Sequence, residues 1–154
     1  MRSLVVLVLT IALMDGCALQ SAQRAASGSY IEAVPGIDPT QLAQQLTTYL
    51  AGLYPPANTT FILMLTATDQ PGNPLTSALT SALSKAGFAV ADLSTAASLP
   101  KRANVHHVRY RISAFDERTL VELDIDDRTI TRLYAPDKSG LLAAVSAPAV
   151  RESH

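Results

Sequence analysis

Cys17 is the residue with the clearest chemistry, because it is the only cysteine among the 154 residues. It stands after Arg2 and an apolar run over residues 4–14, which is the order of the charged and hydrophobic parts of a secretory signal. That run is shorter than the roughly 20 apolar residues that span a bilayer. A thiol directly after Gly16 at the end of such a run is typical of a bacterial lipobox. We therefore predict that residues 1–16 are removed, that the sulfur of Cys17 is diacylated and that the new N-terminus is acylated.

The residues around the cysteine bear on processing and retention. Met14 stands where a lipobox usually has Leu, and Asp15 places a charge beside the cleavage site. The alternative is therefore an ordinary signal peptide that is cut nearby, with Cys17 incidental. Ala18 would be the second residue of the mature chain, where an Asp is the usual signal for retention in the inner membrane. Because acyl chains contribute about 0.8 kcal/mol per buried methylene, we expect the anchor to be lasting. Because Ala18 is not an Asp, we expect it in the outer membrane, with the protein facing the periplasm.

The other reactive side chains predict no active site, no metal site and no cofactor. His106 and His107 are adjacent, and neighbours on a strand point to opposite faces, so they cannot bind one metal together. The carboxylates of residues 116–117 and 126–127 lie in expected turns, where aspartate is common. The chain has no G-x-S-x-G motif and no nucleotide-binding glycine motif. Twelve Lys and Arg against thirteen Asp and Glu leave no basic excess for direct nucleic-acid binding. We predict that the protein is not an enzyme.

Helical periodicity and capping signals predict two helices. The first covers residues 39–54, with Asp38 as its cap, a proline at its first position and Gln41 completing a capping box. The second begins at an Asn-Pro pair and ends at a glycine, over residues 74–87. In both helices leucines recur at intervals of three and four residues, which predicts one apolar face on each helix.

Short runs of β-prone residues predict five strands. These are residues 59–66, 88–91, 108–113, 121–125 and 129–134. The first two flank a helix, which predicts a parallel or mixed pair joined by a crossover. The last three alternate apolar and polar residues across short turns, which predicts an antiparallel meander. We expect Arg109 and Arg111 to pair with Glu122 and Asp124 on its polar face.

The predicted fold class is α+β, with two helices packed on a small mixed β-sheet that ends in a three-stranded antiparallel meander. We divide the chain into a lipoprotein signal peptide (1–16), a flexible tether (17–37), a globular domain (38–136) and an irregular or weakly helical tail (137–154). The predicted core consists of Leu46, Leu50, Leu79, Leu83, Tyr110, Ile112, Val121 and Leu123.

Three segments carry a resemblance to a known family. They are the region ending at Cys17, residues 53–56 together with 75–90, and residues 120–134. The last is a strand, a tight turn and a short strand that closes on Arg132 and Tyr134. Together they resemble TrbH, the small lipoprotein family of conjugal transfer systems, over most of residues 1–135. The tail differs, because residues 141–150 are Ala-rich where the family tends toward a basic end with an aromatic residue.

The resemblance implies a lipid-anchored, non-enzymatic envelope component of the conjugative type IV secretion apparatus that forms mating pairs. Its partners would be other envelope proteins, and the membrane through acyl chains on Cys17. We expect Arg132 and Tyr134 to contact a partner, because they end the last predicted strand at an exposed sheet edge. The alternative for these two residues is internal packing. The alternative is an auxiliary lipoprotein of an envelope transport system that binds a lipid or a small solute.

Overall fold

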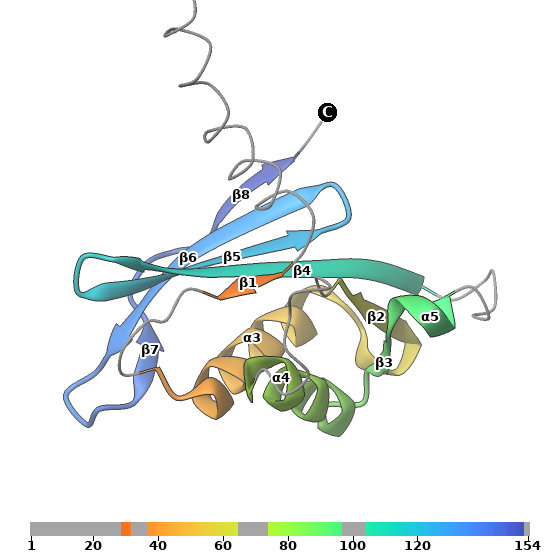
Figure 1. Ribbon diagram of the computed structural model, residues 1–154, viewed down its shortest axis with the longest axis horizontal. Coiled ribbons are helices and arrows are strands. Elements are labelled where there is room, and N and C mark those ends of the chain that lie inside the picture. The colour runs from red at the N-terminus through yellow and green to blue at the C-terminus, as the bar shows by residue number, and fades with distance from the viewer. Residues whose placement is uncertain (1–28, 32–36, 65–73, 97–103, 153–154) are drawn as a thin grey trace, which may run out of the picture.

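A computed structural model describes residues 29–31, 37–64, 74–96 and 104–152, and it places helices on one face of a mixed sheet (Figure 1). The helices are α3 (Pro39–Leu53), α4 (Pro74–Lys85) and the short α5 (Leu93–Ala96), with a 3-10 turn over Pro56–Asn58. The strands are β1 (Tyr30–Ile31), β2 (Thr59–Leu63), β3 (Ala89–Ala91), β4 (Asn104–Phe115), β5 (Arg118–Ile125), β6 (Arg128–Pro136), β7 (Leu142–Ala144) and β8 (Ala149–Glu152).

The strands form one sheet in the order β3-β2-β4-β5-β6-β7, with β1 also beside β4 and β8 also beside β6. β2 is parallel to β3, as the crossover through α4 requires, and it is also parallel to β4. β4, β5 and β6 are antiparallel and joined by two-residue turns. Asp116 and Asp126 begin these turns at φ 54° and 53°, a left-handed conformation that aspartate tolerates. The predicted α+β fold with its three-stranded meander is confirmed.

α3 begins where the sequence predicts, but one of its capping bonds is different. The carboxylate of Asp38 accepts a hydrogen bond from the Thr40 amide at 2.8 Å, and a proline occupies the first turn. Gln41 does not complete a capping box. Its Oε1 instead accepts a hydrogen bond from the backbone N–H of Leu142 at 2.8 Å. The first turn of α3 is thereby tied to β7.

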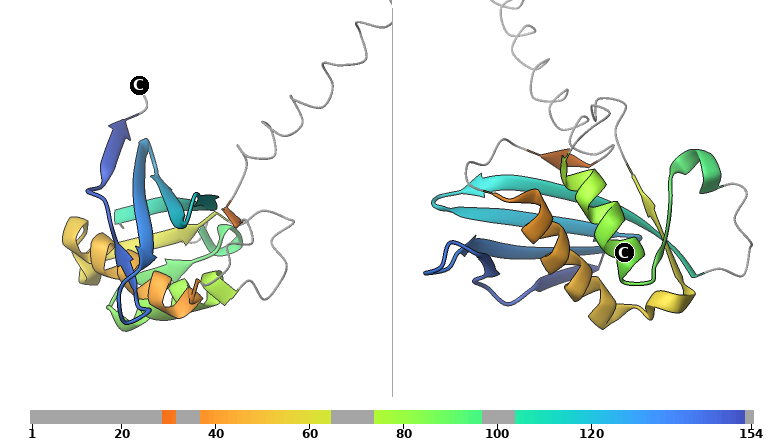
Figure 2. Two further views of the ribbon diagram at one scale, coloured as in Figure 1. Left: turned by 90° about the vertical axis from the view of Figure 1, so that its left-hand side faces the viewer. Right: turned by 90° about the horizontal axis from the view of Figure 1, so that it is seen from below.

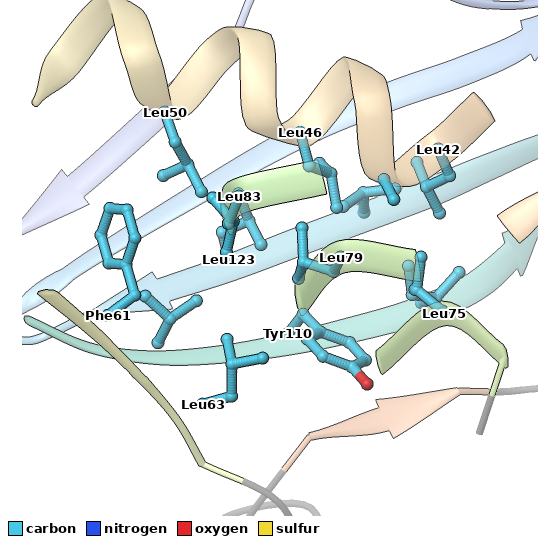
Figure 3. Close-up of a cluster of buried hydrophobic side chains, with 14 of the residues drawn as sticks. Leu42, Leu46, Leu50, Phe61, Leu63, Leu75, Leu79, Leu83, Tyr110 and Leu123 are labelled. Atoms are coloured by element: carbon cyan, nitrogen blue, oxygen red, sulfur yellow. The ribbon is translucent and has the colours of Figure 1, made fainter. Parts of the chain in front are cut away.

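The core lies between the helix pair and the inner face of the sheet (Figure 2, right, and Figure 3). All eight residues predicted for it are buried in one apolar cluster. The leucines of α3 and α4 point toward one another and toward Tyr110 of β4 (Figure 3). Tyr110 is fully buried, and its hydroxyl lies 2.5 Å from Thr76 Oγ1 of α4. This hydrogen bond satisfies the one polar atom that the ring brings into the core.

Residues 29–31 belong to the folded domain, so the flexible tether predicted over 17–37 is wrong for them. β1 pairs in parallel with the second half of β4. Ser29 is buried, and its Oγ donates to the carbonyl of Met64 at 2.8 Å and accepts from the N–H of Tyr110 at 3.3 Å. These bonds fill the edge of β4 between its pairing with β2 and its pairing with β1.

The tail predicted to be irregular or weakly helical over residues 137–154 forms two strands, so that prediction is wrong for its described part. β7 pairs with residues 134–136 of β6 and β8 with residues 128–131, both in antiparallel orientation. Between the two strands, the N–H of Leu133 donates to Ser146 Oγ at 3.0 Å. The outer edge of β6 is therefore covered along most of its length.

Replacing Leu79 or Leu83 by Ala should lower the free energy of unfolding by about 2–5 kcal/mol. Both side chains are fully buried between the helices and the sheet, so each change leaves a cavity. Leu53→Ala is the matched control, because Leu53 is 49% exposed at the end of α3 and its loss should cost no more than about 0.5 kcal/mol. Guanidinium unfolding of the purified protein measures all three variants, and equal losses would contradict the described packing.

Candidate functional site

Cys17 lies outside the residues that the structure describes, so its lipidation stays a prediction. Among the residues described, no helix has the length and apolar character needed to cross a membrane. The predicted partner contacts, Arg132 and Tyr134, both lie on β6 within the described part of the chain. The register of β5 and β6 places both residues opposite inward-facing residues of β5, Arg132 beside Val121 and Tyr134 beside Thr119. Both side chains therefore belong to the face of the sheet that the helices cover.

The guanidinium of Arg132 joins three parts of the fold. Its Cζ lies 5.9 Å from the ring centre of Tyr49 on α3 and 5.8 Å from that of Tyr134 on β6. Its Nε donates a hydrogen bond to the backbone carbonyl of Ser146, in the segment between β7 and β8, at 3.0 Å. A cation held between two aromatic rings and a carbonyl is stabilised by each of them. Arg132 therefore links α3, the meander and the tail.

Tyr134 cannot contact a partner in the folded domain, because only 2% of it is exposed. Burial raises the pKa of its hydroxyl above the ordinary value, and the positive charge of Arg132 opposes that rise. The predicted exposed edge is also wrong, because β7 and β8 cover this side of β6. Arg132 keeps part of its surface exposed. The local sequence gives no signal for Ser146 as its partner, because the contact depends on the course of the tail.

Asp126 contacts both histidines of β4. His106 Nδ1 lies 2.6 Å from Asp126 Oδ2, and the backbone N–H of His107 donates to Asp126 Oδ1 at 2.9 Å. The ring of His106 also packs 4.4 Å from that of Tyr54, centre to centre. Burial raises the pKa of the Tyr54 hydroxyl, and the charge of Asp126 adds to this rise. Within the described ranges, no group of three His, Cys, Asp or Glu side chains is placed to hold a metal ion.

The outer face of the meander carries the ion pairs that the alternation predicts. Arg109 Nε lies 3.1 Å from Asp124 Oδ2, and Arg111 contacts both Asp124, at 3.3 Å, and Glu122. Thr129 on β6 donates to the other oxygen of Asp124 at 2.7 Å. The predicted pairing across β4 and β5 is confirmed. Each of these two carboxylates is held by an arginine, so the cluster fixes the register of the three strands.

Comparison with known proteins gives one result. A family model described as "Conjugal transfer protein TrbH" matches residues 21–153. No curated protein and no solved structure matches the chain. The matched range includes every helix and strand of the described fold.

Arg132→Met should lower the free energy of unfolding by about 1.5–4.5 kcal/mol. The change keeps the length of the side chain but removes two cation–aromatic contacts and one hydrogen bond, each of which contributes about 0.5–1.5 kcal/mol. Arg118→Met is the control, because Arg118 is exposed at the start of β5 and should change stability by no more than about 0.5 kcal/mol. Denaturant unfolding of both variants measures the difference. Equal stability would mean that Arg132 does not hold the tail to α3.

Proposed function

This chain belongs to the TrbH family of conjugal transfer proteins, and we propose that it is a lipid-anchored, non-enzymatic envelope component of the conjugative type IV secretion apparatus. In this role it takes part in forming the mating pair. The observation that carries the proposal is the family match over residues 21–153, which covers nearly the whole chain. A conjugal transfer protein that enters the envelope needs an export signal, and the sequence supplies one over residues 1–16.

The proposed anchor limits how far the domain reaches from the membrane. Ser29, the first described residue, stands twelve positions after Cys17. Twelve residues span at most about 40 Å when fully extended. An acylated Cys17 would therefore keep the folded domain within that distance of the bilayer surface. With Ala18 as the second mature residue, we place the anchor in the outer membrane and the domain in the periplasm.

Protein binding, rather than catalysis, fits the side chains that the structure describes. Several polar side chains take part in contacts within the fold, since Asp126 contacts both histidines and the arginines of β4 contact Glu122 and Asp124. We propose other envelope proteins of the apparatus as its partners, with no direct contact to nucleic acid. The comparisons offer no support for the alternative of a transport lipoprotein that binds a lipid or a small solute.

Cys17→Ser should abolish labelling by palmitate and release the protein from the membrane fraction, because serine supplies no thiol for lipid transfer. Ala18→Asp is the matched control. It leaves the thiol in place, so labelling should persist while the protein moves to the inner-membrane fraction. Radiolabelling and membrane separation by density measure both outcomes. Palmitate on the Cys17→Ser protein would contradict the lipobox interpretation and favour the alternative of an ordinary signal peptide.

Deleting the gene should lower DNA transfer between cells and leave growth and the nicking of the transferred DNA intact. An envelope component acts after the DNA has been nicked, so only the transfer of that DNA to the recipient cell should decrease. Mating assays against the parental donor, with the gene restored in a second arm, measure this effect. Parental transfer by the deletion strain, across donors and mating conditions, would remove the basis of the proposal.

A further inference from the structure

The outer face of the meander is apolar at the end where β4 turns into β5. The water-exposed face of an antiparallel sheet ordinarily carries polar side chains, and the arginine–carboxylate pairs fit that rule in the middle of β4 and β5. Toward the turn, however, the outward positions hold Phe115 of β4, Leu120 of β5 and Leu133 of β6. Leu120 and Leu133 lie directly opposite each other, and both are half-buried.

Two residues of the tail extend this apolar area. Val145 follows β7, and its N–H donates to the carbonyl of Leu133 at 2.9 Å, so it continues the same row across the sheet. Leu141 lies in the turn before β7 and is 55% exposed. Phe115 is 52% and Val145 49% exposed. Contiguous exposed apolar patches mark interaction sites more often than scattered residues do. We call this patch the apolar end, consisting of Phe115, Leu120, Leu133, Leu141 and Val145.

Charged residues of both signs border the apolar end. Asp116 and Glu117 form the β4–β5 turn, Arg118 begins β5, and Lys138 lies in the β6–β7 turn. The two turns lie at the same end of the sheet (Figure 1). All four side chains are exposed, and none of them forms an ion pair with a described residue. An apolar centre inside a polar rim is the composition of a protein interface.

We propose that the apolar end is the contact surface between two copies of this chain, packed sheet against sheet about a two-fold axis. Sheets that pack face to face interdigitate their side chains across about 10 Å. An axis that runs along the strands between β5 and β6 exchanges β5 with β6 and β4 with β7. The strand pairing then places each large side chain over an equal or smaller one of the second copy: Leu120 over Leu133, Phe115 over Ala143, and Val145 over Ser113.

The rim charges favour a second copy over a lipid surface. The same axis brings the β4–β5 turn of one copy to the β6–β7 turn of the other, because the two turns lie at one end of the sheet. Glu117 of each copy thereby meets Lys138 of the other, so one surface supplies both partners of two ion pairs. Helices that bind the bilayer surface carry a polar face rich in Lys and Arg, whereas here Asp116 and Glu117 stand beside the most exposed aromatic residue.

The size of the apolar end predicts a weak dimer. A standard interface uses about 20–30 residues a side, and this patch with its rim supplies fewer. Chains that share one membrane meet at a higher effective concentration than free chains, which favours a weak contact without any new one. Only this enrichment rests on the proposed function, because the complementarity of the two surfaces does not depend on an anchor.

Photo-crosslinking in cells that make two differently tagged copies of the full chain tests the occupant. A benzoyl-phenylalanine replaces Val145, or Leu53 at the end of α3, which has the same exposed fraction of 49%. We expect position 145 to join the two tags, with the adduct mapping to residues 111–122 of the second copy, and position 53 not to. An adduct with another protein or with lipid instead, equal adducts from both positions, or none from position 145 would overturn the proposal.

A charge exchange tests the arrangement of the two copies. Glu117→Lys and Lys138→Glu each set like charges against each other at both turns, so each should lower the yield of the position-145 adduct about threefold or more. The double variant restores opposite charges and should return the yield to within about twofold of the parent. Single variants at the parental yield, or a double variant no better than the singles, would overturn the proposed two-fold arrangement.

Leu133→Glu tests the apolar centre. It places a carboxylate where the two sheets meet and should lower the adduct yield about tenfold or more. Leu53→Glu makes the same change outside the apolar end and should leave the yield within about twofold of the parent. Denaturant unfolding of both proteins shows that they fold, and a parental yield from folded Leu133→Glu protein would overturn the proposal. A deletion strain with parental DNA transfer would contradict the proposed function and leave these crosslinking results unchanged.

Discussion

β4 is the strand on which the other elements depend, because it is paired along both edges and separates two chemically different faces. One edge pairs with β2 and then with β1, and the other pairs with β5. Its alternation places Val108, Tyr110 and Ile112 in the core and Arg109 and Arg111 on the opposite face. A shift by one residue would exchange these faces. A single register therefore fixes both the packing of the helices and the ion pairs of the meander.

The sequence predicts the helices and strands that have a periodic pattern of their own. It does not predict the short strands that form only by pairing with the edges of other strands. α3, α4 and the meander follow from leucine spacing, caps and alternation, and their predicted core is confirmed. β1, β7 and β8 are two to four residues long, too short for any periodicity to show. They exist because β4 and β6 have open edges to pair. The bonds from Ser29 to Met64 and from Leu142 to Gln41 span 35 and 101 positions, beyond the reach of local patterns.

The difference between local patterns and long-range pairing also explains which site residues were predicted correctly. Arg109 and Arg111 face Glu122 and Asp124 because an alternating hairpin with a two-residue turn fixes its register locally. Tyr134 would lie at a free edge only if the sheet ended at β6. The tail closes that edge, and Arg132 is held against the tail by the carbonyl of Ser146. Arg132, near the end of β6, therefore connects α3 to the tail.

The charges of the described domain are divided between its two layers. The sheet and its turns hold the arginine–carboxylate and histidine–carboxylate pairs, whereas α3 and α4 together hold one lysine. β1, the most N-terminal described element, enters the fold at the edge of β4 and so belongs to the sheet layer. The helix layer, in which α3 and α4 hold only one charged residue, lies on the other side of the core.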